Sequence, residues 1–154
     1  MRWFAVQTVP VATLTNTAKP LYYPSGGALL IHRTADQQLG DWDERFFLYY
    51  EDVAYALAAR RVKIPIQAIS EPVVEHIGGL SSRTLGTPRL LYYHYRNSLL
   101  VQRRYGPWWV RLLLPWWSLA LVARHTIQIL TDYQHTEHHR AIIQGVLDNW
   151  IPRY

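Results

Sequence analysis

Gly106 and Pro107 divide this chain into two parts with different patterns. Before them, short apolar runs alternate with stretches of helical spacing, which is typical of the α/β class. The apolar runs cover 28–31, 64–69 and 73–76, and the helical stretches cover 34–39, 52–61 and 88–105. After Pro107 only helical spacing continues, over 110–130 and 136–149. We therefore predict an α/β domain over residues 1–107, followed by a helical tail over 108–154.

The length of 154 residues suits one domain with a helical appendage, and a hydrophobic content of 49% is enough for a sizeable core. The chain has no cysteine, so disulfides and thiolate metal sites are excluded. The apolar patch near the N-terminus lacks a clean apolar stretch followed by a small-residue cleavage site. We do not expect it to be a signal peptide.

Two adjacent carboxylates, Glu51 and Asp52, follow an aromatic run and stand at the start of a predicted helix. Aromatic surroundings raise the proton affinity of a carboxylate, whereas a helix N-terminus favours its ionised form. A carboxylate between these influences is well placed to accept a proton from a substrate hydroxyl. The alternative is purely structural, because acidic residues are favoured in any first helical turn.

The segments around this pair carry a family resemblance. They are SGGALLIHR (25–33), DWDERFFLYYED (41–52), EPVVEHIGGLSS (71–82) and YYHYRN (92–97). In this order and spacing they resemble the C-terminal half of family 2 glycosyltransferases, especially the rhamnosyltransferase-like branch. The match covers about residues 24–107, and its most specific part is 43–52 together with His76, Gly78 and Gly79.

The resemblance implies a partial GT-A-like mixed sheet with flanking helices, and the acceptor-side half of an inverting glycosyltransferase. Such an enzyme transfers a sugar from a nucleotide-sugar to a cell-surface polysaccharide or a lipid-linked oligosaccharide. By the resemblance, Asp52 would be the catalytic base that takes the proton of the acceptor hydroxyl, and Glu51 would orient the acceptor or hold the loop. Whether the chain is active alone stays open.

The resemblance also implies substrate contacts from two glycines, two acids and three polar loop residues. These are Gly26, Gly27, Asp43, Glu44, Ser81, Ser82 and Arg83. The glycines would leave room for the sugar or the acceptor, with a tight turn as the alternative. The helix pair Arg96-Asn97 also matches the family, and we expect it to be structural.

Enzymes of this family use Mn²⁺ or Mg²⁺ bound by an Asp-x-Asp motif in the donor-binding half. Asp41-Trp42-Asp43 fits that string, but it leads into the acceptor-side match, so we interpret it as part of that loop. The donor-binding half should precede Pro24, where only about two dozen residues stand. This chain would then be a fragment, the product of a split gene whose other half is a separate chain, or a degenerate remnant. His76 is a candidate metal ligand, with a bond to a backbone carbonyl as the structural alternative.

Three histidines near the C-terminus, His135, His138 and His139, invite a second metal hypothesis. His135 and His139 stand four residues apart, so on a helix they could share an ion. No third ligand is evident beside them, although Asp132 and Glu137 are nearby. A solvated helix face is therefore the favoured interpretation.

The charge distribution points to a surface partner. The net charge is +5, and no acid occurs from His76 to Thr131. Arginine and tryptophan alternate in this window, at Arg103, Arg104, Trp108, Trp109, Arg111, Trp116 and Trp117. This combination suits an anionic membrane surface, where indoles lie at headgroup level and guanidinium groups meet phosphates. Nucleic acid is the competing partner, and the leucine-rich run 112–123 argues against it.

That uncharged run is shorter than the roughly 20 residues that a transmembrane helix needs. We therefore favour an interfacial helix over a helix buried against the domain or a membrane span. The resulting hypothesis is a peripheral glycosyltransferase on the cytoplasmic, inner face of a bacterial plasma membrane. The alternative is a non-catalytic membrane-surface or partner-binding module derived from a glycosyltransferase.

Overall fold

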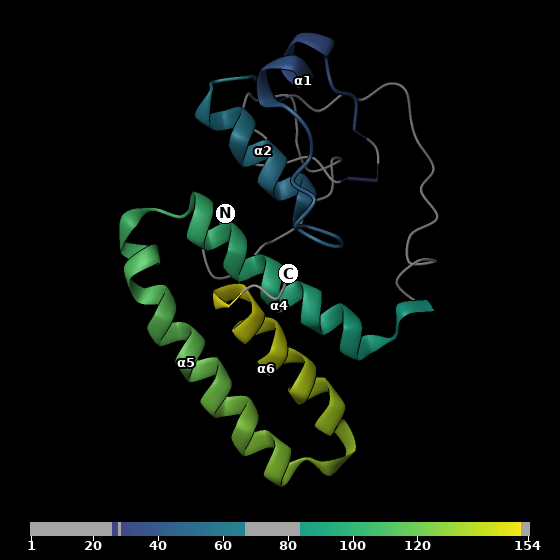
Figure 1. The fold of residues 1–154 in the computed structure, drawn as a ribbon, viewed down its shortest axis with the longest axis vertical. Coiled ribbons are helices and arrows are strands. Elements are labelled where there is room, and N and C mark those ends of the chain that lie inside the picture. The colour runs from purple at the N-terminus through teal and green to yellow at the C-terminus, as the bar shows by residue number, and fades with distance from the viewer. Residues whose placement is uncertain (1–25, 28, 67–83, 152–154) are drawn as a thin grey trace, which may run out of the picture. The chain divides into compact units, whose positions relative to one another are not determined.

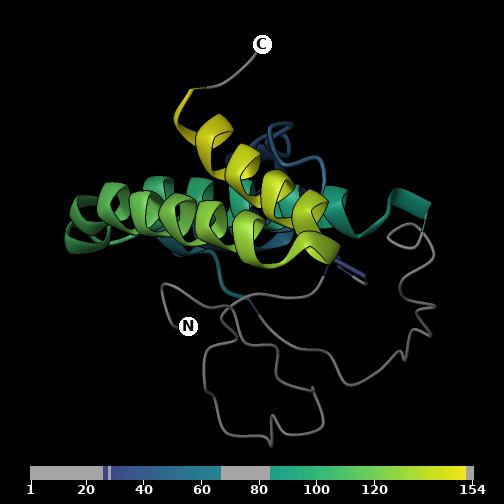
Figure 2. The ribbon, with the colours of Figure 1, turned by 90° about the horizontal axis from the view of Figure 1, so that it is seen from below.

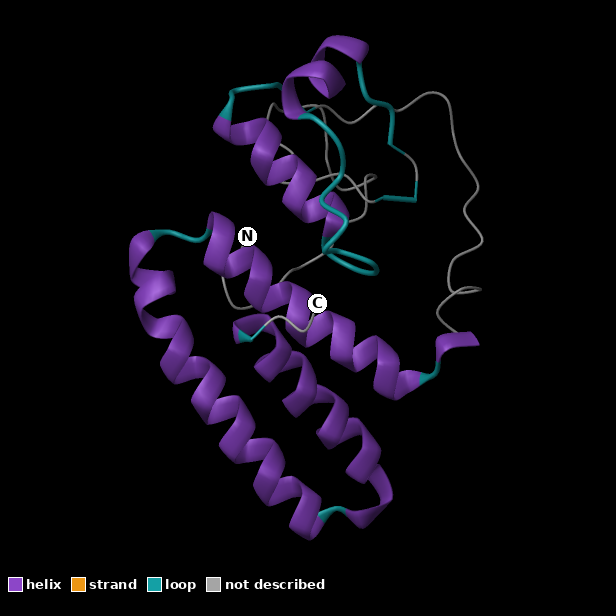
Figure 3. Cartoon of the chain, in the orientation of Figure 1, coloured by secondary structure: helices purple, strands orange, loops and turns teal. Residues whose placement is uncertain are grey.

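The computed structural model describes residues 26–27, 29–66 and 84–151, and in these ranges it contains helices and loops (Figure 3). The helices are α1 (Arg33–Leu39), α2 (Glu51–Arg61), α4 (Thr87–Tyr105), α5 (Trp108–Thr131), the short 3₁₀-helix η2 (Tyr133–His135) and α6 (Thr136–Trp150). In these same ranges, no helix combines the length and the apolar character that crossing a membrane requires.

The five predicted helices are confirmed, and their ends agree with the sequence within two residues. Glycine and proline explain this agreement. Gly40 ends α1 with a φ of 75°, and its N–H donates to the carbonyl of Asp36 at 2.8 Å. Pro88 stands in the first turn of α4, and Gly106 ends that helix by donating to the carbonyl of Gln102 at 2.8 Å.

The predicted α/β class, with its partial GT-A-like mixed sheet, is wrong for the described part of the chain, which contains no strand. Residues 29–31 and 64–66 are loops, and Leu30 is 86% exposed. A three-residue apolar run gives no periodicity to identify a strand, and a strand without a pairing partner is unstable. Ala28, residues 67–69 and the predicted strand 73–76 lie outside the described residues.

The chain divides into two compact units, Met1–Glu44 with Glu51–Gly78, and Arg45–Tyr50 with Gly79–Tyr154. In the first unit, α1 packs against α2. The ring of Trp42 stacks on that of Tyr55 with 4.6 Å between centroids, and the Tyr55 hydroxyl donates to Asp36 at 3.4 Å. The buried face of α2 is small, consisting of Val53, Ala54, Ala56 and Ala59.

The second unit is a bundle in which α4, α5 and α6 lie side by side, as two perpendicular views show (Figures 1 and 2). Helix α6 packs against both of the others. Their shared core consists of Leu99, Leu114, Leu121, Ile142 and Val146. A glycine allows α6 to approach α4 closely, because a Cβ atom at Gly145 would lie 2.5 Å from the carbonyl oxygen of Tyr92.

Polar side chains fasten the C-terminal end of α6 to the bundle. The Trp150 indole donates to the Ser118 hydroxyl at 3.0 Å, and Arg103 donates to the carbonyl of Asn149 at 2.7 Å. The Tyr92 hydroxyl donates to the buried carboxylate of Asp148 at 3.0 Å. Burial of these groups would be costly without partners, so the bonds fix the register of α6 on its neighbours.

Candidate active site

Asp52 lies in the first turn of α2, where backbone N–H groups hold both of its carboxylate oxygens. Oδ2 accepts the N–H of Gly26 at 2.9 Å, and Oδ1 accepts the N–H of Val53 at 2.7 Å. The predicted site residues Gly26 and Asp52 are therefore brought together across 26 positions of sequence. A carboxylate offers about four acceptor positions, so these two bonds leave acceptor capacity for a substrate hydroxyl.

Glu51 differs from its neighbour in environment. Its Oε2 atom is buried and has no hydrogen-bond partner among the described residues. Burial raises the pKa of the Glu51 carboxyl, and the charge of Asp52 raises it further, against a lowering by a backbone N–H. A carboxyl whose pKa is shifted upward toward neutrality is better suited to exchange protons with a substrate. The sequence predicts two opposing influences on the pKa of this pair, and at Glu51 the upward influence of burial is the larger.

The backbone that leads into the pair has an uncommon conformation. Tyr49 and Tyr50 adopt left-handed φ angles of 64° and 70°, which bulky residues rarely do. The buried side chain of Asn97 on α4 donates to the carbonyls of Leu48 and Tyr49, at 2.7 and 3.1 Å. These bonds within the second unit hold the strained turn that ends at the residue before Glu51.

Arg96 extends this clamp. Its Nη1 atom donates to the carbonyl of Arg45 and to the side-chain oxygen of Asn97, each at 2.8 Å. The Arg96-Asn97 pair thus holds both ends of the segment Arg45–Tyr50 on α4. The structural role that the sequence predicted for this pair is confirmed. No local residue pattern predicts the turn that this pair holds in place.

The other predicted substrate contacts differ in exposure, and some of them lie outside the described residues. Gly27 is exposed in a turn beside Gly26. Asp43 is half-buried and Glu44 is exposed, in the loop that follows α1. Four predicted site residues, His76, Ser81, Ser82 and Arg83, lie outside the described residues.

The histidine-rich segment does not form the solvated face that the sequence favoured. His139 is buried, and its Nδ1 atom lies 3.0 Å from Nδ1 of His125 on α5. His135 is exposed and contacts the Asp132 carboxylate at 3.0 Å, and this contact is the main reason that the pKa of Asp132 is lowered. No group of three histidine, aspartate or glutamate side chains in the described ranges could hold a metal ion.

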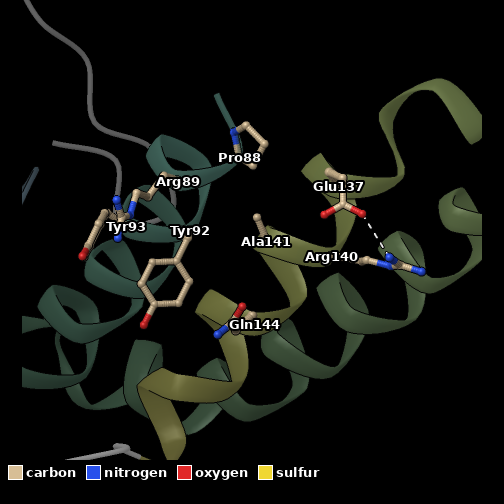
Figure 4. A pocket seen from close by; sticks show the side chains of 8 residues that line it. All are labelled: Pro88, Arg89, Tyr92, Tyr93, Glu137, Arg140, Ala141 and Gln144. Carbon is tan, nitrogen blue, oxygen red and sulfur yellow. Dashed lines mark hydrogen bonds and ion pairs between the residues drawn. The ribbon is translucent and has the colours of Figure 1, made fainter. Parts of the chain in front are cut away.

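An open groove of about 400 Å³ lies between α4 and α6 (Figure 4). Tyr92 and Tyr93 line one side, and Ala141 and Gln144 line the other. Arg140 at its rim pairs with Glu137 at 3.0 Å and is not available as a lone cation. Among the described residues, the predicted substrate contacts Gly26, Gly27, Asp43 and Glu44 are not part of its lining.

The predicted membrane-surface residues fall into two groups. Trp108 and Trp116 are 73% and 70% exposed, and Arg104, Trp109, Arg111 and Trp117 are exposed as well. Arg103 is different, because it points into the bundle. It bonds to the Asn149 carbonyl, and its guanidinium lies 5.6 Å from the centre of the Trp150 ring.

Comparison with known proteins supports the family resemblance. Over 113 residues, 70% of its length, the chain is 33% identical to an N-acetylglucosaminyl-diphospho-decaprenol L-rhamnosyltransferase of Mycobacterium tuberculosis, found in two strains. This chain is related to glycosyltransferases. It is also 26% identical over 85 residues, 55% of its length, to a low-salt glycan biosynthesis hexosyltransferase of Haloferax volcanii.

The chain spans 36% of the length of the mycobacterial relatives and 28% of the haloarchaeal one. No protein-family profile matches the chain, and no solved structure is similar to it. The relationship to glycosyltransferases therefore rests on two sequence comparisons, each covering about a third of the relative.

Proposed function

We propose that this chain provides the acceptor side of an inverting glycosyltransferase. The observation that carries the proposal is the carboxylate pair at the start of α2. One carboxylate is oriented by backbone N–H groups, and the other is partly buried with a raised pKa. The relationship to glycosyltransferases gives the pair its chemical context.

In the proposed reaction, an acceptor hydroxyl attacks the anomeric carbon of a nucleotide-sugar. The bond from that carbon to the nucleoside diphosphate breaks, and the configuration inverts. The proton of the hydroxyl passes to Asp52, whose fixed orientation defines where the hydroxyl must lie. Glu51 beside it positions the acceptor, and burial raises the pKa of its carboxyl.

Mn²⁺ or Mg²⁺ remains an expectation from the family resemblance. The described residues include no set of three ligating side chains, so they do not fit a complete cation site by themselves. No step of the proposed reaction is therefore assigned to a cation. The steps above concern what the carboxylates of this chain do to the acceptor.

The test measures acceptor binding and transfer separately. The purified chain is titrated with a short-prenyl diphosphate-linked saccharide, and then incubated with UDP- or dTDP-sugars and Mn²⁺ while products are followed by mass spectrometry. We expect saturable acceptor binding. Where transfer occurs, Asp52→Asn should reduce its rate by about 10²–10⁴-fold, the usual contribution of a positioned base.

Glu137→Gln is the matched control, because it removes an exposed carboxylate that belongs to the second unit. It should leave binding and transfer unchanged. Acceptor binding without donor binding would support an acceptor-side part that needs another chain for the donor. Absence of acceptor binding, or transfer that survives Asp52→Asn, would contradict the proposal.

A second candidate is a non-catalytic surface-binding module, and the exposed tryptophans of α5 favour it. It predicts binding to anionic vesicles that is independent of Glu51 and Asp52, with no acceptor binding. Either candidate would place the protein at the inner face of a plasma membrane. Membrane fractionation of cells that express the chain tests this location.

A further inference from the structure

Helix α5 carries two apolar faces, and only one of them is covered. Its inner face contributes Val110, Leu114 and Leu121 to the bundle, with exposures of 0%, 0% and 8%. A second set of apolar residues recurs at intervals of three or four and is exposed throughout. This outer stripe is Leu112, Trp116, Leu119, Ala123, Ile127 and Leu130. At about 100° per residue, Trp116 lies about 200° around the helix from Leu114, on its opposite side.

The outer stripe is larger than the apolar patches that soluble proteins usually expose. Its five large side chains are 61–70% exposed, and they extend along most of a helix of 24 residues. Soluble proteins rarely expose a contiguous apolar patch of more than a few hundred Å², and larger ones mark interaction surfaces. Scattered exposed leucines would need no explanation, but an unbroken stripe with helical spacing does.

The charges beside the stripe identify its partner. Helices α4 and α5 together contain six arginines and no acidic residue. Two of them, Arg111 and Arg124, are exposed on opposite sides of the outer stripe, each about a third of a turn from its centre. Trp108 and Trp109 stand at the N-terminal end of the same helix. Flanking arginines and terminal tryptophans are the pattern of a helix lying in the headgroup region of an anionic bilayer.

We propose that α5 lies in the plane of an anionic lipid surface, with its outer stripe in contact with the acyl chains. Arg111 and Arg124 then meet lipid phosphates, while the inner face stays packed in the bundle. This mode of binding leaves the three-helix core intact, because no residue of the inner face has to leave α4 or α6. The inference does not depend on the proposed glycosyl transfer.

A second copy of the chain is the main competing partner. Apolar residues at intervals of three and four also suit helix-to-helix packing. Two copies joined through the outer stripe would, however, bring Arg111 and Arg124 of one copy near those of the other. Neither α4 nor α5 supplies an acid to pair with them. Like charges at such a margin oppose association, so the anionic surface is the better match.

The experiment is co-sedimentation of the full chain with vesicles of phosphatidylcholine, alone or with phosphatidylglycerol. We expect binding to the anionic vesicles that weakens in 0.5 M NaCl. The double variant Leu112→Ser/Leu119→Ser should bind at least tenfold more weakly, because it removes two side chains from the acyl region. Arg111→Gln and Arg124→Gln should each reduce binding about fivefold, and only on anionic vesicles.

Leu147→Ser on α6 is the matched control, because Leu147 is an exposed leucine of the same bundle that is not in the outer stripe. It should bind as the unchanged chain does, and all variants should unfold at the same temperature. Equal binding by the stripe variant and the unchanged chain would overturn the proposal. Absence of vesicle binding would also overturn it. A dimer in sedimentation that the stripe variant dissociates would then assign the stripe to a second copy.

Discussion

The two units of this protein are stabilised in different ways. In the second unit, leucines and valines from three helices meet in one core, and Leu99, Leu114 and Val146 are less than 2% exposed. Each such side chain contributes about 1.5–3 kcal/mol when it is fully buried. In the described part of the first unit, the buried face of α2 is Val53 with three alanines. An alanine methyl contributes only about 0.8 kcal/mol.

The unit with the larger apolar core is therefore not the unit that carries the carboxylate pair. The carboxylate pair lies on α2, whose position depends strongly on hydrogen bonds such as that from Gly26 to Asp52. The bundle carries the outer stripe and the Asn97 clamp, which are stabilised by a large apolar core. Substitutions in the two units should therefore differ in kind. Those in the bundle should change stability, and those near the pair should change binding.

Leu114→Ala should have the largest effect. The side chain is fully buried between the three helices, so its truncation removes apolar contacts and leaves a cavity. We expect the free energy of unfolding to fall by about 2–5 kcal/mol. Leu113→Ala, on the same helix but 49% exposed, should change it by less than about 0.5 kcal/mol. Urea denaturation measures both, and equal effects would show that α5 is not packed by its inner face.

The helices could be predicted from the sequence because their ends are marked by individual residues. Gly40, Pro88 and the pair Gly106-Pro107 each impose a local geometry that neighbouring residues cannot override. The carboxylate pair was predictable for the same reason, since acids after an aromatic run and before a helix form a local pattern. Its roles rest on the family resemblance.

What could not be predicted depends on contacts between distant residues. The sequence predicts a strand over 28–31, but its described residues 29–31 form a loop, because apolar character alone does not distinguish a strand from a loop. The left-handed turn at Tyr49 and Tyr50 contradicts local preference, and only Asn97, about fifty positions away, explains it. The burial of His139 likewise follows from His125 on another helix. Spacing within one segment contains none of this information.

Asn97→Ala should have the next largest effect. Its amide group supplies hydrogen bonds to the carbonyls of Leu48 and Tyr49, and a methyl group cannot replace them. Because the site is fully buried, we expect a loss of about 1–3 kcal/mol in the free energy of unfolding. Ser98→Ala, which removes a bond to a carbonyl of its own helix, is the control and should cost less. Similar losses for the two variants would disprove the clamp.

Acidic pH should destabilise the bundle through His125. Burial, and then the neighbouring His139 and Arg124, hold the pKa of His125 below its usual 6.5. The unfolded chain therefore binds a proton at a pH where the folded chain does not, so stability falls as the pH drops below about 6.5. The Tyr95 ring also contacts His125 in an edge-to-face arrangement, and it carries no charge. We expect a lower unfolding midpoint at pH 5 than at pH 7.5.

His125→Phe distinguishes this effect from that of His94, whose pKa burial also lowers, because it keeps the aromatic contact with Tyr95 and removes one titrating group. Its unfolding midpoint should change less between pH 7.5 and pH 5. Asp132 does not interfere in this range. Its pKa is lowered from 3.8, so the stability it contributes is lost only in more acidic solution. An unchanged pH dependence in the variant would exclude His125 as the source.

Gly26→Ala should have the smallest effect on stability. Compared with Gly145→Ala, it tests whether the same substitution affects binding in the first unit and stability in the second. A methyl group there would lie 3.6 Å from the Asp52 carboxylate, an ordinary contact, so the free energy of unfolding should change by less than about 0.5 kcal/mol. The same change at Gly145 meets backbone at 2.5 Å and should cost about 1–3 kcal/mol.

The methyl at position 26 would, however, occupy space beside the carboxylate that the proposed acceptor hydroxyl must reach. Titration with the saccharide acceptor should therefore show weaker binding to Gly26→Ala and unchanged affinity for a folded Gly145→Ala.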